Sequence, residues 1–110
     1  MKEADVVLTP IPQADGVIKN RPAIILRESD FLVCGVSTQL DKEVKGFDEV
    51  ISDTDEDFKS SGLRTSSLVR LGFLAVLPSR QIIGAIGSIS STRHGKLLKT
   101  LSDYLIMNRA

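Results

Sequence analysis

Short apolar runs alternate along this chain with charged residues, prolines and glycines. The runs are rich in valine, isoleucine and leucine, and their length and boundaries are typical of β-strands rather than of helices. We therefore expect a mainly β protein with short connections. The expected strands cover residues 5–11, 23–26, 31–37 and 82–89, with a short edge strand over residues 49–52.

The longest apolar stretch runs from Ser66 to Leu77 and contains two breaks in its pattern. Arg70 and Gly72 interrupt it, and Pro78 closes it. A glycine inside a strand pattern often marks a bulge or the corner of a barrel. We therefore expect two strands or one sharply bent strand here, followed by a tight turn. Many short strands with glycine corners predict a small β-barrel.

The pattern becomes helical near the end of the chain. Apolar side chains recur there at helical spacing, and Ser90 and Ser91 are both good residues for a helix N-terminus. We expect a helix that begins near these serines, ends near Met107 and packs one apolar face on the barrel. The apolar positions are Leu97, Leu98, Leu101, Tyr104 and Leu105.

A polar group is predicted where two strands meet. Arg21 opens an apolar strand, so its guanidinium is expected at the rim of the core. The short connection over residues 27–30 makes the next strand its hairpin neighbour, which places Ser37, Thr38 and Gln39 beside Arg21. The preceding polar residues, 13–20, are expected to form a surface loop that moves over this group.

The 110 residues are enough for one domain, which we place over residues 1–110. The formal net charge is zero, so no global charge favours nucleic acid or membrane. The distribution is uneven, however. Residues 41–57 hold eight acidic and two basic side chains, whereas residues 58–110 hold one acidic and eight basic side chains. The acidic segment is expected to screen the basic half or to bind elsewhere.

The single cysteine, Cys34, lies within an apolar run, where a buried thiol is expected and an internal disulfide is impossible. The charged N-terminus does not resemble a signal peptide, and no apolar run approaches the roughly 20 residues that span a bilayer. We therefore expect a soluble, cytoplasmic protein.

Two features allow both a functional and a structural interpretation. His94, the only histidine, is either catalytic or, as we favour, a surface residue on the first turns of the helix. The acidic run over residues 53–57 resembles a calcium loop but lacks its central glycine and distal glutamate. A solvated turn without a metal site is the favoured interpretation.

Several motifs occur in an order that is known from one family. Residues 5–8 (Asp-Val-Val-Leu), 20–26 (Asn-Arg-Pro-Ala-Ile-Ile-Leu) and 36–39 (Val-Ser-Thr-Gln) form the first three. Residues 62–70 and residues 83–90, which precede the expected helix, form the last two. Together they resemble the PemK/MazF family of toxin endoribonucleases, the mRNA interferases of type II toxin–antitoxin systems. The resemblance covers nearly the whole chain.

The resemblance implies a small SH3-like barrel that forms homodimers and cleaves single-stranded RNA without a metal ion or other cofactor. The products would be a cyclic phosphate and a free 5′-hydroxyl. The resemblance also implies an antitoxin partner with an acidic, partly disordered segment, which the basic C-terminal half would attract. The implied catalytic residues are Arg21, Ser37, Thr38 and Arg70, and the implied RNA-binding residues are Gln13, Lys19, Asn20 and Gln39.

The residue types fit this chemistry in part. Arginine suits the binding of a phosphate, because its planar fork grips two oxygens and stays charged. In one branch of the family the arginine that matches Arg70 is the proposed acid, and an aspartate two residues later is the proposed base. Gly72 replaces that aspartate here, and no nearby acid obviously takes its place. The base stays unassigned, with Asp15 or a water as candidates.

Alternatives remain for the residues and for the function. Arg21 either contacts substrate or pairs with an acid such as Glu28, and Arg70 is either a site residue or the partner of a buried carboxylate. Ser37 and Thr38 are either site hydroxyls or ordinary strand-end residues. The missing aspartate favours a non-catalytic binding module with the same fold. A related barrel that poisons a protein target such as gyrase is a third possibility.

Overall fold

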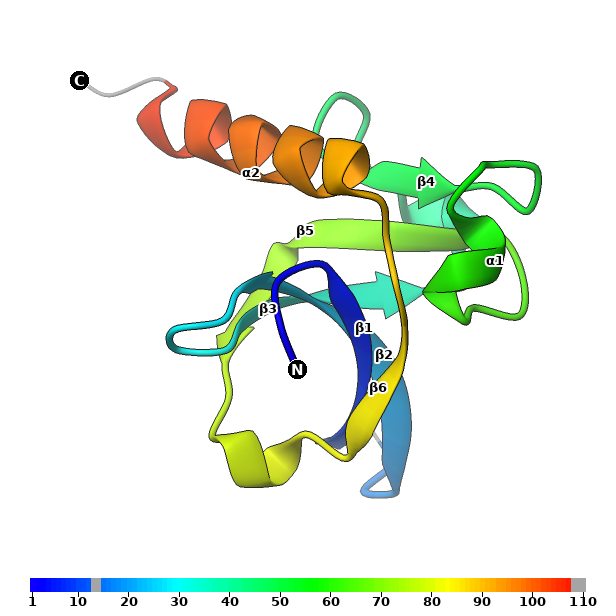
Figure 1. The fold of residues 1–110 in the computed structure, drawn as a ribbon, viewed down its shortest axis with the longest axis vertical. Helices are drawn as coiled ribbons and strands as arrows, with labels where there is room; N and C mark the ends of the chain where they lie inside the picture. Colours follow the sequence, from blue (N-terminus) through cyan, green and yellow to red (C-terminus); the bar gives the residue numbers. More distant parts are fainter. Residues whose placement is uncertain (13–14, 108–110) are drawn as a thin grey trace.

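The computed structural model, which describes residues 1–12 and 15–107, is one curled antiparallel sheet with a helix laid across it (Figure 1). The strands are β1 (Asp5–Pro12), β2 (Ile18–Arg27), β3 (Leu32–Ser37), β4 (Glu49–Ile51), β5 (Ser67–Val76) and β6 (Gly84–Ser88). They are hydrogen-bonded in the order β4-β5-β3-β2-β1-β6, so β4 and β6 are the edges. The sheet bends into a half-barrel, and the predicted mainly β fold is confirmed.

Within the described residues, four helical segments complete the fold, and one of them is long. They are η1 (Leu40–Lys42), α1 (Phe58–Ser61), η2 (Ser79–Gln81) and α2 (Ser91–Ile106). The Ser90 hydroxyl caps α2 by accepting a hydrogen bond from the backbone N–H of Arg93 at 3.1 Å. The predicted start of this helix is therefore confirmed.

The core fills the inside of the curl and one face of α2. Leu97 and Leu101 of α2 are buried against apolar side chains of the strands. His94 Nε2 lies 2.9 Å from the backbone oxygen of Leu26, so the expected surface histidine is a structural contact between α2 and β2. Cys34 is buried as predicted, and burial raises the pKa of its thiol to about 12. Among the described residues, no helix is long and apolar enough to cross a membrane.

The hairpin of β1 and β2 is longer than predicted. Residues 18–20, which we expected in a loop, belong to β2 and pair with residues 10–12 of β1. The expectation of a moving loop is therefore wrong for residues 18–20. Their polar sequence concealed the strand, because this part of the hairpin extends away from the core and Ile18 is 64% exposed. The pairing with β1 holds it.

β5 is one bent strand, which is the second of the two alternatives that its central glycine allowed. On the neighbouring strand β3, Cys34 pairs with Leu74 whereas Gly35 pairs with Arg70. Residues 71–73 of β5 therefore have no partner in β3 and form a bulge at which the strand turns. The residues before the bulge are mostly buried, and those after it are exposed.

α1 lies so close to β6 that two glycines are required at the contact. A Cβ atom on Gly87 would collide with the backbone oxygen of Ser60, and one on Gly62 would collide with that of Ile86. Gly62 also has a φ of +76°, in the left-handed region that favours glycine. The loop that follows Gly62 is therefore held in a defined position on β6.

Arg93, in the first turn of α2, binds three carboxylates of the acidic segment. Its Nε, Nη1 and Nη2 atoms each lie 2.8 Å from an oxygen of Asp57, Glu49 and Asp55, respectively. The side chains of Arg93 and Asp57 are only 11% and 6% exposed. The interpretation of residues 53–57 as a solvated turn is therefore wrong for Asp55 and Asp57, because their cationic partner is distant in sequence.

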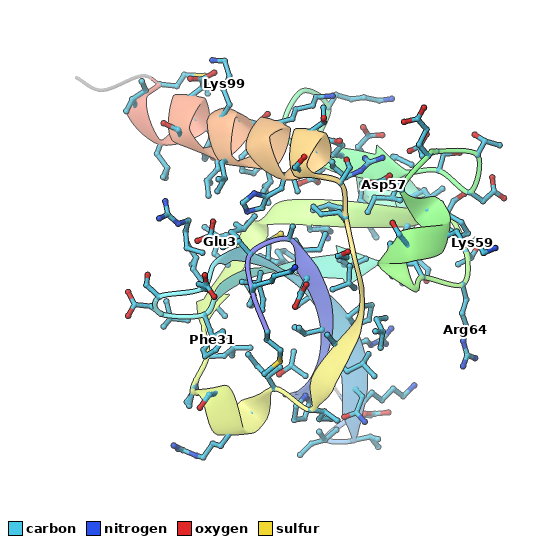
Figure 2. All side chains as sticks on the ribbon, viewed as in Figure 1. Glu3, Phe31, Asp57, Lys59, Arg64 and Lys99 are labelled. Atoms are coloured by element: carbon cyan, nitrogen blue, oxygen red, sulfur yellow. The ribbon has the colours of Figure 1, made fainter. Side chains whose placement is uncertain are left out.

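Asp57 joins α1 to the start of α2 (Figure 2). It precedes α1, binds Arg93, and accepts a hydrogen bond from the backbone N–H of Ser90 at 3.0 Å. The hydrogen bonds from Arg93, above all, lower the pKa of Asp57 to about 2, and those same contacts raise the pKa of Arg93. The start of α2 is thereby tied to α1 and to the loop beyond it.

We predict that this network makes stability depend on pH below roughly pH 5. The pKa of Asp57 is about 2 in the folded chain, below the ordinary value of about 3.9 expected in the unfolded chain. Its stabilising contribution is therefore present above the unfolded value and is lost as the pH falls towards the folded value. The urea midpoint should fall over this interval, and should fall less in Asp57→Asn.

The matched control is Asp53→Asn, which removes an exposed carboxylate of the same segment. This control should follow the wild-type curve, whereas Asp57→Asn should be less stable than both at neutral pH. An equal dependence of the urea midpoint on pH in all three proteins would contradict the prediction.

Candidate functional site

Arg21, Ser37 and Thr38 form a wall that two clefts share. β2 and β3 pair with Ala23 opposite Gly35, which brings the start of β2 beside the end of β3. All three residues of the wall line both clefts. The hairpin predicted from the sequence is confirmed, and so is the meeting of Arg21 with the two hydroxyl residues.

The larger cleft, of about 430 Å³, lies between this wall, the loop after α1 and strand β6. Its lining combines apolar surface with polar groups that come from separate parts of the chain. The apolar residues are Leu8, Pro22, Val36, Leu63 and Ile86, and the polar residues beyond the shared wall are Asn20, Arg64, Thr65 and Ser67.

The smaller cleft, of about 250 Å³, lies against β5. Gln39 and Arg70 supply its polar groups beyond the shared wall. The Arg70 guanidinium carbon lies 4.1 Å from the centre of the Phe73 ring, a cation–π contact that holds the cation in place. The backbone N–H of Gln39 donates to the Ser37 hydroxyl oxygen at 3.0 Å, so the Ser37 proton can be donated to a ligand.

Behind Arg70 lies Asp48, an acid whose role the sequence did not reveal. Asp48 Oδ2 is 3.8 Å from Arg70 Nε, and the Asp48 side chain is 2% exposed. Its two oxygens accept hydrogen bonds from the backbone N–H groups of Val44 and Leu71 at 2.9 and 3.1 Å. Arg70 is therefore both the partner of a buried carboxylate and a lining residue of the cleft. Asp48 does not replace the carboxylate missing at Gly72, since it faces inward.

The predicted RNA-binding residues are distributed unevenly. Asn20 lines the larger cleft and Gln39 the smaller one. Lys19 is exposed on the β1–β2 hairpin and lines neither cleft. Gln13 lies outside the described residues.

Two candidate partners are placed away from the clefts. The Asp15 carboxylate accepts a hydrogen bond from the backbone N–H of Val17 at 2.9 Å near the hairpin tip, and it lines neither cleft. Glu28 follows the far end of β2, roughly 20 Å from Arg21 at the usual rise of a strand. The suggested pairing of Arg21 with Glu28 is therefore wrong.

Sequence reasoning missed Arg64, Thr65 and Phe73. Figure 2 shows Arg64 projecting outward from the loop after α1, which reaches β2 only through the tertiary fold. A basic and a hydroxyl residue shortly after Gly62 were the available signal, but their distance in sequence from Arg21 concealed it. Phe73 lies in an apolar run, which favours a core position, but it follows the bulge in β5 and its side chain is 59% exposed.

The two clefts are electropositive. Three arginines, Arg21, Arg64 and Arg70, line them, and no Asp, Glu or His is among the described lining residues. Guanidinium groups beside hydroxyl donors are well suited to bind phosphate. The surface around the shared wall is therefore fitted to an anionic ligand.

Comparisons with known proteins show the fold. No protein-family model and no curated protein matches this sequence. A solved structure, an endoribonuclease in complex with its cognate antitoxin from mycobacterial species, aligns with a TM-score of 0.71 over 100% of this chain and 99% of that chain. The two chains share one fold. Their sequence identity is 10%, a level at which likeness shows architecture rather than activity. The small barrel-like toxin fold that the resemblance implied is confirmed.

We predict that Asp48→Asn strongly destabilises this fold. The variant leaves the Arg70 guanidinium without its carboxylate and turns an amide group towards backbone N–H donors. Removing one partner of a buried ion pair typically costs about 3–5 kcal/mol. Urea unfolding at neutral pH measures the loss, with Asp41→Asn on η1 as an exposed control.

A double variant tests whether the two groups are coupled. Asp48→Asn with Arg70→Gln should lose less stability than the sum of the two single losses, because each single variant already breaks the pair. Strict additivity would contradict a direct interaction between Asp48 and Arg70.

Proposed function

We propose that this chain is the toxin of a toxin–antitoxin pair, a PemK/MazF-like endoribonuclease that cleaves single-stranded RNA in the cytoplasm without a metal ion. The observation that carries the proposal is the grouping of Arg21, Ser37, Thr38 and Arg70 around one cleft. These donors can bind a phosphodiester and the extra charge of its transition state. The fold shared with an endoribonuclease adds support.

In the proposed reaction the RNA supplies its own nucleophile. The 2′-oxygen attacks the adjacent phosphorus, a bond from phosphorus to O2′ forms and the bond from phosphorus to O5′ breaks. The 2′-hydroxyl proton passes to water, and the leaving O5′ takes a proton from water. Arg21 and Arg70 stabilise the negative charge on the phosphate, while Ser37 and Thr38 donate hydrogen bonds. Arg70 acts here as a cation, because arginine does not give up its proton in proteins.

A second candidate function is binding of RNA or antitoxin without catalysis. One observation favours it: the described lining of the two clefts contains no carboxylate or imidazole to accept the 2′-hydroxyl proton. Gly72 stands where a branch of the family carries aspartate, and Asp48 is buried behind Arg70. The measured cleavage rate separates the two functions.

We propose that the antitoxin covers the same clefts with an acidic, partly disordered segment. Three arginines and no described acid line them, so an acidic segment meets complementary charge there. The endoribonuclease that shares this fold is itself bound to its cognate antitoxin. An antitoxin in this position would exclude RNA from Arg21.

We propose further that two copies pair along the outer edge of β5. β4 pairs with β5 only over Ser67–Val69, and among the described residues no strand lies beside the rest of that edge. Phe73, Leu74 and Val76 of β5 are 59%, 40% and 64% exposed. An exposed apolar strand edge is a surface on which another chain can pair.

We predict that Arg21→Ala lowers the rate of RNA cleavage by about 10²- to 10³-fold, because it removes a cation that stabilises the phosphate. Wild-type protein and the variant are incubated with a long single-stranded RNA in EDTA, and the new ends are mapped. The wild type should leave discrete cyclic phosphate ends. Arg80→Ala, an exposed arginine of η2 that lines neither cleft, should cleave like the wild type.

Each contrary outcome identifies the part of the proposal that fails. Equal cleavage by Arg21→Ala would exclude Arg21 from the reaction, and cleavage only with added divalent ions would exclude the metal-independent mechanism. Bound but intact RNA would favour the non-catalytic module.

We predict that Val76→Lys converts a dimer into a monomer, because it places a charge on the apolar edge of β5. Sedimentation velocity measures the change. Ile83→Lys adds the same charge at a similarly exposed apolar residue outside this edge, and it should leave the dimer intact. A monomeric wild-type chain would contradict the proposed pairing.

A further inference from the structure

We infer that the larger cleft binds a base of the RNA strand whose phosphate lies at Arg21, with Asn20, Arg64 and Thr65 as the residues that recognise it. The inference rests on the proposed function and adds to it the site at which a base of the strand is recognised. It assigns a role to the loop after α1.

The walls of the larger cleft suit a flat, uncharged ring. Leu8, Pro22 and Val36 contribute apolar surface from the sheet, and Leu63 and Ile86 contribute it from the other side. The volume of about 430 Å³ lies within the range of roughly 300–1,000 Å³ found for small-ligand sites. A nucleobase can therefore be enclosed between aliphatic side chains.

The polar side chains of the cleft are available to a ligand. In the described part of the chain, the side chains of Asn20, Arg64 and Thr65 make no hydrogen bond or ion pair with another protein group. The Asn20 amide both donates and accepts hydrogen bonds, as does the Thr65 hydroxyl. A base in single-stranded RNA presents both kinds of group on its edges. The cleft can therefore match a base by hydrogen bonding as well as by shape.

The shared wall determines which nucleotide enters. Because Arg21, Ser37 and Thr38 line both clefts, a phosphate bound there has one cleft on each side. A strand that crosses Arg21 then places a neighbouring base in the larger cleft. Arg64 projects outward from the loop after α1 (Figure 2), so the next phosphate of the strand would pass along that side of the cleft.

The outer wall of the cleft is in place before a ligand arrives. The close contact of Gly62 with Ile86 fixes the start of the loop that carries Arg64 and Thr65. Asp57, bound to Arg93, holds α1 from behind. A preformed site loses less conformational entropy on binding than a flexible one, which favours selection of one base over others.

An acidic antitoxin segment can cover the mouth of this cleft, but a base fits its interior better than a carboxylate does. Arg21 comes from the shared wall and Arg64 from the loop after α1, and much of the lining is apolar. A carboxylate placed between them would lose water without gaining a close cation. The RNA backbone, in contrast, can place one phosphate at each cation and the uncharged base between them.

The test is an NMR titration of the ¹⁵N-labelled full chain with a short 2′-fluoro RNA, which cannot be cleaved because it lacks the attacking hydroxyl. The amide signals of residues 63–65 should shift together with those of Ser37 and Thr38. Arg64→Gln should weaken binding roughly three- to tenfold and lower the slope of log K against log salt by about one.

Two further variants complete the test. Thr65→Val keeps the shape of the side chain, removes the hydroxyl, and should change the preference among uridine, adenosine and cytidine oligomers by roughly fivefold. Arg80→Gln lies outside both clefts and should leave affinity, salt slope and base preference unchanged.

Shifts confined to the surroundings of Arg70 and Phe73 would overturn the inference, as would shifts at residues 63–65 that an acidic peptide produces and RNA does not. The cleavage assay with Arg21→Ala decides the proposed function separately. Cleavage without a response at residues 63–65 leaves the proposed function and removes this inference. Base-dependent binding without cleavage leaves the cleft as an RNA site on a non-catalytic module.

Discussion

One guanidinium, that of Arg93, joins parts of the chain that lie far apart in sequence. A largely buried charge is tolerated only when it is paired, and Arg93 is paired with three carboxylates. Asp57, one of the three, also accepts the backbone N–H of Ser90. The first turn of α2, the edge strand β4 and the helix α1 therefore depend on the same group. The loop that forms the outer wall of the larger cleft begins at Gly62, directly after α1.

The distribution of charge follows from this arrangement. The acidic segment screens the basic half by direct ion pairs, as one of the two expectations had it. Asp48, Glu49, Asp55 and Asp57 pair with arginines of residues 58–110 inside the fold. The described lining of the two clefts, in contrast, contains arginines and no acid. A chain of zero net charge thus presents a locally positive surface. Such local fields, rather than the total, steer anionic ligands.

The described lining of the site combines arginines and hydroxyl groups with no evident base. Gly72 stands where a branch of the resembled family carries an aspartate. Asp48 lies behind Arg70, but both of its carboxylate oxygens accept hydrogen bonds from backbone N–H groups. In the proposed reaction, stabilisation of the phosphate charge by Arg21 and Arg70 is then the main contribution of this chain. The same donors would serve a module that binds RNA without cleaving it. The two proposed functions therefore require the same fold, and they differ in whether a group is present to accept the 2′-hydroxyl proton.

The sequence by itself determined most strands, the C-terminal helix, the break at Gly72 within the longest apolar stretch, and the meeting of Arg21 with Ser37 and Thr38. Each of these depends on local periodicity, on a glycine or proline, or on a short hairpin connection. Only the tertiary structure decided that β2 begins at Ile18, that Asp55 and Asp57 bind Arg93, that Asp48 lies behind Arg70, and that Arg64 and Thr65 join the site. These contacts link residues far apart in the chain or lie beyond the core, where no apolar pattern marks them. Such ion pairs form where packing brings distant charges together, and no local pattern in the sequence marks which of many possible partners will meet.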